Sequence, residues 1–145
     1  MKCRQSSTYR LVELLRDEVL CPIVDRLPGT LSCQCIGQQI MLDIMDALFQ
    51  LTNAVKAPKG EPRYLFLIAA QKRLDDISSN VLALRQRSKR FDEVNQEGKK
   101  PARIVTARQY SSFLAEMAKV YADLDTWIGS NAAAMLKDRT AAPSE

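Results

Sequence analysis

One segment of the chain, residues 106–128, constrains the fold more than any other. Large apolar residues recur in it at every third or fourth position, namely Tyr110, Phe113, Leu114, Met117, Tyr121, Leu124 and Ile128. This spacing places them along one side of an α-helix. The opposite side is polar and contains Arg108, Ser112, Glu116, Lys119 and Asp123. A helix with one apolar side needs partner helices to cover it, and the rest of the chain offers three more segments of this kind.

The first of these segments covers residues 6–27. Its predicted N-cap is Ser6, Ser7 or Thr8, because a hydroxyl oxygen there accepts a hydrogen bond from a free amide of the first helical turn. Pro22 lies inside the segment. Since proline lacks a backbone donor and crowds the preceding turn, it predicts a kink near residues 19–21.

The second helix is predicted to begin near residues 32–36 and to end at the turn formed by residues 57–60. The third begins at Glu61-Pro62 and keeps its apolar stripe to Leu84. It is apolar on more than one side, which predicts a central position in the bundle or a face used for self-association. Thr106 is the predicted N-cap of the fourth helix.

Four amphipathic helices in 145 residues predict an all-α fold, an antiparallel four-helix bundle with up-down-up-down order. Residues 1–130 are expected to form this single domain, and residues 131–145 a helical extension that frays into a flexible tail. No apolar run approaches the roughly 20 residues that span a bilayer, and the polar start does not resemble a secretory signal. We therefore expect a soluble, cytoplasmic protein without membrane association.

Between residues 86 and 105 the apolar periodicity fails, which predicts a long basic loop between the third and fourth helices. The candidate nucleic-acid-binding residues lie in and beside this loop, at Arg85, Arg87, Lys89, Arg90, Lys99, Lys100, Arg103 and Arg108. Only three acids lie among them, so this stretch carries more positive charge than the net +4 of the whole chain. Either the stretch binds phosphate or an acidic partner, or it is an ordinary solvated loop with cations near a helix end.

Catalytic chemistry is not expected, because the chain contains no histidine and so lacks the usual general base and the commonest transition-metal ligand. Asp75-Asp76 and the pair of Asp43 with Asp46 lack the partner residues of a carboxylate metal site. We expect a non-enzymatic protein with no catalytic residues, no metal and no cofactor.

The four cysteines also have a plain interpretation. Cys33 and Cys35 are separated by one residue, while Cys3 and Cys21 each stand alone, which is poor spacing for zinc. We expect reduced thiols, buried or half-buried. Trp127 and the tyrosines fall at helical spacing, where aromatic residues belong to a core more often than to a platform that stacks on bases.

Three features of the sequence resemble a known family. They are Leu20-Cys21-Pro22 followed by Leu27-Pro28, the segment from Leu31 to Ala54 with a glycine near its start, and Thr106-Ala-Arg-Gln-Tyr110 followed by Trp127-Ile128. From Tyr9 to about Ser130 the layout resembles the four-helix bundle proteins related to those encoded in 23S rRNA intervening sequences. Within that group it is most similar to the Avd-like accessory proteins of diversity-generating retroelements.

The resemblance implies a non-enzymatic scaffold that assembles into a homopentamer. It also implies that the scaffold binds a reverse transcriptase and its RNA, or DNA, through a basic surface. The family places arginines along the third helix, where this chain has Asp75, Asp76, Ser78 and Asn80, so the binding charge is expected in the loop instead. The alternative is a structural or regulatory adaptor that binds a protein partner only, through the apolar excess of the third helix that includes Tyr64 and Phe66.

Overall fold

The computed structural model of the protein describes residues 6–94 and 104–141, with side chains placed at 6–87 and 104–140. The regular structure in this part of the chain is entirely helical, which confirms the predicted all-α class. A first rod is formed by three consecutive elements, α1 (Ser7–Leu14), the π-helical η2 (Leu15–Leu20) and α2 (Cys21–Asp25). Three long helices follow, α3 (Leu31–Lys56), α4 (Glu61–Val94) and α5 (Ala107–Ala141).

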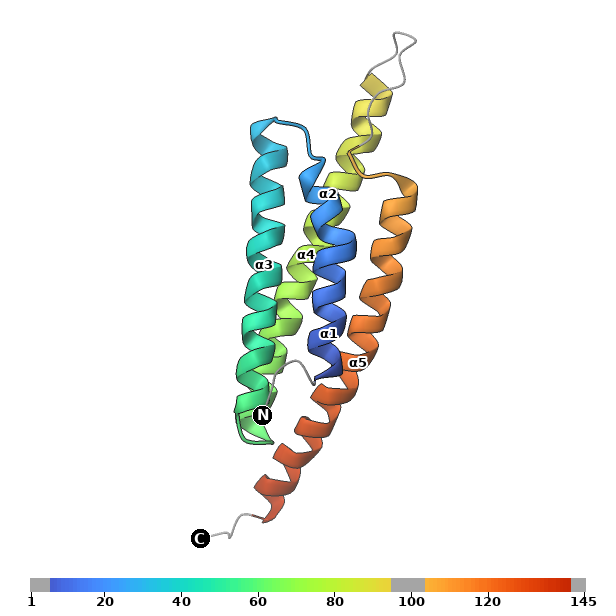
Figure 1. Ribbon diagram of the computed structural model, residues 1–145. Coiled ribbons are helices and arrows are strands. Elements are labelled where there is room, and N and C mark those ends of the chain that lie inside the picture. Colours follow the sequence, from blue (N-terminus) through green and yellow to red (C-terminus); the bar gives the residue numbers. More distant parts are fainter. Residues whose placement is uncertain (1–5, 95–103, 142–145) are drawn as a thin grey trace.

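The four rods lie side by side, and Figure 1 shows the chain reversing direction from each rod to the next. α3 and α4 pack together along their length, α5 packs on α4, and α1 contacts both α3 and α5. The fully buried large side chains between them are Phe113, Leu15, Leu20, Ile23, Ile40, Ile44, Leu51, Leu67, Leu74, Ile77, Leu84 and Leu124. No helix in the described ranges is both long enough and apolar enough to cross a bilayer.

The stripe that predicted the fourth helix is buried in α5 to different degrees. Phe113, Met117 and Leu124 are buried, whereas Tyr110, Tyr121 and Ile128 are half-buried and pack against the core. Leu114 is the exception, because half of its surface is exposed to solvent. Thr106 is the N-cap of α5, as predicted: its Oγ1 accepts a hydrogen bond from the Gln109 amide at 3.1 Å, and the Gln109 Oε1 accepts one from the Thr106 amide at 2.9 Å.

The first rod begins at Ser6, whose side-chain oxygen accepts a hydrogen bond from the Tyr9 amide at 3.3 Å. Before Pro22 the helix widens into the π-helical η2, where the Cys21 amide donates to the carbonyl of Arg16, five residues earlier. The disturbance predicted from the proline therefore takes the form of a π-helical stretch, and this stretch begins further upstream than residues 19–21.

The turn between α3 and α4 is held by side chains from two helices. The guanidinium of Arg63 donates to the carbonyl oxygens of Ala54 and Ala57, each at 2.8 Å, and so caps the end of α3. The Oδ1 of Asn131, a buried residue of α5, accepts a hydrogen bond from the Gly60 amide at 3.1 Å. Gly60 has φ +109°, a left-handed conformation that side chains other than glycine's disfavour. This turn joins α3, α4 and α5.

The predicted loop over residues 86–105 is wrong at both of its ends. Residues 86–94 continue α4 as a helix, because Arg, Gln, Lys and Glu are good helix formers that sustain a helix without an apolar stripe. At the other end, Ile104 and Val105 are buried in the core, since two adjacent apolar side chains gain more from burial than from exposure. Residues 95–103 of the predicted loop lie outside the described residues.

Candidate nucleic-acid interface

The two ends of the bundle differ in their polar groups. The loop end is where α2 and α4 end and α3 and α5 begin, and the turn end is where α3 ends and α4 begins (Figure 1). The predicted binding residues with described side chains all belong to the loop end, namely Arg85, Arg87 and Arg108. The side chains of Lys89 and Arg90 on α4, and all of Lys99, Lys100 and Arg103, lie outside the described residues.

Arg85 and Arg87 are partly used by the fold. The Nη1 of Arg85 donates to the carbonyl oxygen of Val105 at 2.9 Å, which ties the segment before α5 to α4. The Nη1 of Arg87 donates to the Oγ of Ser32 in the first turn of α3. A guanidinium has five N–H donors in a planar fork, so each of these side chains keeps donors beyond the one that the fold uses.

Arg108 lines a hollow of about 360 Å³ between the first rod and the beginning of α5. Its lining residues are Glu18, Val19, Pro22, Arg26, Thr106, Arg108, Gln109 and Ser112. Both arginines are exposed. Among the described side chains neither guanidinium has an ion-pair or hydrogen-bond partner, so both are available to a ligand.

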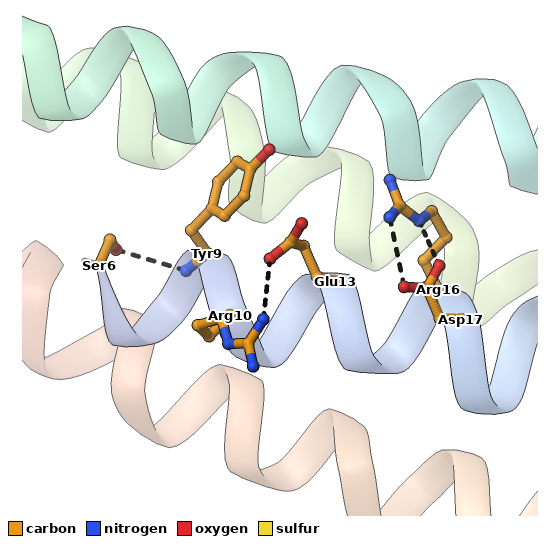
Figure 2. A network of polar contacts seen from close by, with 6 residues as sticks. All are labelled: Ser6, Tyr9, Arg10, Glu13, Arg16 and Asp17. Carbon is orange, nitrogen blue, oxygen red and sulfur yellow. Dashed lines mark hydrogen bonds and ion pairs between the residues drawn. The ribbon is translucent and has the colours of Figure 1, made fainter. Parts of the chain in front are cut away.

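Other arginines of the first rod are paired with acids on the same rod, as Figure 2 shows. The guanidinium of Arg10 lies 3.7 Å from the carboxylate of Glu13. The Nε of Arg16 donates to the Oδ1 of Asp17 at 2.7 Å, and this hydrogen bond holds the pKa of the Asp17 carboxyl below its usual value. Arg26 therefore differs from its neighbours along the same rod, which have carboxylate partners.

The electrostatics of the hollow favour an anion. Two arginines line it, and the N-terminus of the long helix α5 adds the partial positive charge of the helix dipole. Glu18 is the acid among the lining residues, and it forms no ion pair with either arginine at 4 Å or less. A phosphate group matches this arrangement, because guanidinium forks bind phosphate oxygens through parallel N–H bonds.

Arg26 was missed by the sequence interpretation. It is distant in sequence from the cluster of Arg85 to Arg108, and only the packing of the first rod beside α5 brings it to Arg108. No local spacing in the sequence encodes that proximity. Conversely, the clustering of basic residues in the sequence does not show which of them form hydrogen bonds within the fold. Arg85 and Arg87 form such bonds, whereas Arg108 has no described partner.

Exposed apolar side chains lie mainly on α3 rather than on the third predicted helix, which corresponds to α4. Leu31, Leu42, Met45 and Phe49 of α3 are more than half exposed. On α4, Tyr64 and Phe66 are half-buried, and Phe66 packs against the core. α4 still exposes Leu65 and Leu82. Of these two helices, α3 therefore exposes more large apolar side chains, although the sequence interpretation gave it no surface role.

The turn end also has a hollow, of about 400 Å³, but its carboxylate is bonded to two hydroxyls beside it and its arginine to backbone carbonyls. The carboxylate of Asp123 accepts hydrogen bonds from the hydroxyls of Ser7, at 2.7 Å, and Thr8. These bonds join the start of the first rod to α5, and Thr8 is buried. The arrangement stabilises the packing of two helices, in contrast to Arg26 and Arg108 at the loop end, which have no partner among the described side chains.

In the parts of the chain that the structure describes, no three His, Cys, Asp or Glu side chains lie close enough together to bind a metal ion. Cys21 is half-buried, Cys33 is buried and Cys35 is exposed, all as free thiols.

Comparison of the protein with family models, with curated proteins and with solved structures gave no match.

Proposed function

We propose that the protein is a non-enzymatic scaffold whose loop end binds RNA, or other nucleic acid, in the service of a reverse transcriptase from a diversity-generating-type retroelement. The observation that carries the nucleic-acid part is the hollow between Arg26 and Arg108 at the N-terminus of α5. The reverse transcriptase partner, the cytoplasmic location and a homopentameric assembly rest on the resemblance of residues 9–130. The bundle that goes with this proposal has up-down-up-down order and a basic connection from α4 to α5.

Phosphate contacts suit the chemistry of this end of the bundle. Arg26 and Arg108 offer guanidinium groups at the hollow, while Arg85 and Arg87 keep unused donors near the end of α4. Such contacts hold a nucleic-acid backbone without reading its bases. The scaffold would therefore bind structured RNA with little sequence preference of its own, and the reverse transcriptase would perform the chemistry.

A pair of charge-matched double variants tests this assignment. Arg26→Ala with Arg108→Ala removes the two arginines at the hollow, and Arg10→Ala with Arg139→Ala removes two at the turn end. Arg10 and Arg139 form exposed ion pairs with Glu13 and Glu61, both at 3.7 Å, and such pairs contribute little to stability. Both variants lose the same net charge, so the comparison isolates position.

The expected result is that the loop-end variant loses roughly tenfold or more in affinity for a structured RNA at low salt, with a salt slope shallower by about 2, because two phosphate contacts disappear. The turn-end variant should stay close to the wild type. Equal affinities for the two variants would show that the hollow does not contact RNA.

A broader variant tests the rest of the predicted basic surface. Replacing Arg87, Lys89, Arg90, Lys99, Lys100 and Arg103 with alanine should weaken RNA binding strongly while leaving the helical content, measured by circular dichroism, intact. Unchanged RNA binding would remove this stretch from the mechanism and leave the hollow between Arg26 and Arg108 as the whole interface.

The second candidate function is an adaptor that binds a protein partner only. It is favoured by the exposed apolar side chains of α3, which include Leu42, Met45 and Phe49. An adaptor of this kind would form a complex that is insensitive to salt, because burial of apolar surface is not screened by ions. It would also have no affinity for nucleic acid, so the RNA-binding assay separates the two functions.

A further inference from the structure

Glu18 is an acid of the first rod that lines the same hollow as Arg26 and Arg108. Its side chain is exposed and has no hydrogen-bond or ion-pair partner among the described side chains. Two other acids of this rod, Glu13 and Asp17, are paired with arginines at 3.7 and 2.7 Å. The hollow therefore contains two cationic groups and one anionic group that do not pair with one another.

The packing of the first rod against α5 gives the hollow two different ends. The two rods run in opposite directions (Figure 1), and the hydroxyl of Thr8 donates to the carboxylate of Asp123 near the turn end. Glu18 is ten residues after Thr8 and Ser112 is eleven residues before Asp123, so these two lie at about the same level. Arg26 lies eight residues beyond Glu18, or about 12 Å further along the rod towards the loop end.

The two ends of the hollow therefore suit different groups of a ligand. The guanidinium groups of Arg26 and Arg108 have donors only, and they bind the oxygens of a phosphate. The ionised carboxylate of Glu18 has acceptors only, so it binds a group that donates a hydrogen bond. A phosphate alone would be repelled by this carboxylate and would gain nothing from it. A matching ligand has a phosphate and a hydrogen-bond donor close together.

A ribonucleotide has both groups, because its sugar carries a 2′-hydroxyl close to the phosphate. This hydroxyl is the group by which a protein distinguishes RNA from DNA. Base amino groups also donate hydrogen bonds, but only some bases have them. A surface that holds the nucleic-acid backbone without reading its bases needs a donor that every nucleotide carries, and the 2′-hydroxyl meets this condition.

We propose that Glu18 makes the loop end prefer RNA to DNA. Its carboxylate accepts a hydrogen bond from the 2′-hydroxyl of a nucleotide whose phosphate is bound by Arg26 and Arg108. The inference rests on the nucleic-acid binding of the proposed function and deepens it by selecting one of the two nucleic acids. With DNA, the carboxylate still repels the phosphates, and no hydrogen bond offsets this repulsion.

The size of the hollow limits the preference. Its volume of about 360 Å³ is at the lower end of the range for small-molecule sites, so it accommodates a single nucleotide rather than a duplex. One hydrogen bond to a charged acceptor at an exposed site should give RNA an advantage of about tenfold.

The test uses a single-stranded oligonucleotide of one sequence, made with ribose, with 2′-deoxyribose and with 2′-fluoro sugars. Single strands avoid the difference in groove shape between RNA and DNA duplexes. A 2′-fluoro group cannot donate a hydrogen bond, so this oligonucleotide should bind like DNA. Binding is measured by fluorescence anisotropy at low salt, and the quantity compared is the ratio of RNA affinity to DNA affinity.

Glu18→Ala should reduce this ratio from about tenfold to within about twofold, because the hydrogen bond is lost for RNA while the repulsion is relieved for both. The matched control is Asp25→Ala, which removes an exposed acid of the same rod that does not line the hollow. It changes the net charge equally and should keep the tenfold ratio. Both residues are exposed, so both variants should fold.

The outcomes separate this inference from the proposed function. An unchanged ratio in Glu18→Ala would overturn the role of Glu18, and so would a wild-type protein without preference for RNA or one that binds the 2′-fluoro oligonucleotide as tightly as RNA. Each of these results leaves phosphate binding at the hollow intact. Absence of binding to all three oligonucleotides at low salt would overturn the proposed function itself, and this inference with it.

Discussion

Two sites at opposite ends of the bundle use arginine in opposite ways. At the turn end, the guanidinium of Arg63 is bonded to carbonyl oxygens in the last turn of α3, including those of Ala54 and Ala57. At the loop end, Arg26 and Arg108 face a hollow and have no partner among the described side chains. The same residue type therefore closes a helix at one end and is available to an anion at the other.

This difference teaches that the number of basic residues is a poor guide to where a ligand binds. A guanidinium that is bonded to backbone carbonyls stabilises the fold, and removing it leaves acceptors without partners. An exposed guanidinium without partners contributes little to stability and keeps its donors for phosphate. Changing one group at a time at each end separates these two uses of arginine.

The largest expected effect is from Arg63→Ala, which should lower the free energy of unfolding by about 3 kcal/mol, because hydrogen bonds from a charged donor to the end of α3 are lost. Urea unfolding followed by circular dichroism measures it. The matched control is Arg108→Ala at the loop end, which should change stability by less than about 0.5 kcal/mol. Equal losses from the two variants would remove the distinction between the ends.

Asn131→Ala should cost about 2 kcal/mol, since it leaves the amide of Gly60 without its buried acceptor. The same unfolding experiment measures it. Asn131→Asp is the comparison variant, because an aspartate retains an acceptor oxygen and should recover part of the loss. If alanine and aspartate are equally destabilising, the hydrogen bond to Gly60 is not what holds the turn.

Glycine substitutions should have smaller effects, of opposite sign at two positions. Gly60→Ala should destabilise by about 1 kcal/mol, because its φ of +109° is unfavourable for a residue with a Cβ. Gly129→Ala should stabilise by up to about 1 kcal/mol, since it lies within α5 and a Cβ there meets nothing within 4 Å. Thermal unfolding of both variants checks the signs, and a stabilised Gly60→Ala would contradict the strained turn.

The smallest effect concerns the paired and unpaired arginines of the first rod. The Arg16 hydrogen bond lowers the pKa of Asp17, so its contribution to stability is present above the ordinary aspartate pKa and is lost as pH falls through the lowered value. Arg16→Gln should return the carboxyl pKa toward its ordinary value in an NMR titration. Arg26→Gln, at a residue without a described carboxylate partner, should leave it unchanged, and a shift there would show a coupling between the two sites.

Features encoded within a few residues could be predicted from the sequence. The caps at Ser6 and Thr106 depend on a hydroxyl beside the first free amides of a helix. The end of α3 depends on a turn that contains proline and glycine, and the buried side of each helix follows from its apolar spacing. In each case the physical cause and the residues that carry it lie together in the chain.

Features that depend on packing between distant segments could not be predicted from the sequence. The proximity of Arg26 to Arg108 exists only once the first rod lies on α5. The exposed apolar side of α3 was not predicted, because Ile40, Ile44 and Leu48 already form a buried apolar side of this helix. Leu42, Met45 and Phe49 lie on another side of the same helix. The continuation of α4 to Val94 was missed because helix propensity, rather than apolar spacing, sustains it.

The most direct test of the central claim is the affinity of the purified protein for a labelled structured RNA over a series of salt concentrations. The account predicts binding whose logarithm falls linearly and steeply with the logarithm of salt concentration, because phosphate contacts release counterions. Absence of binding at the lowest salt concentration, or affinity that does not change with salt, would contradict it and would leave the protein-only adaptor as the function of this bundle.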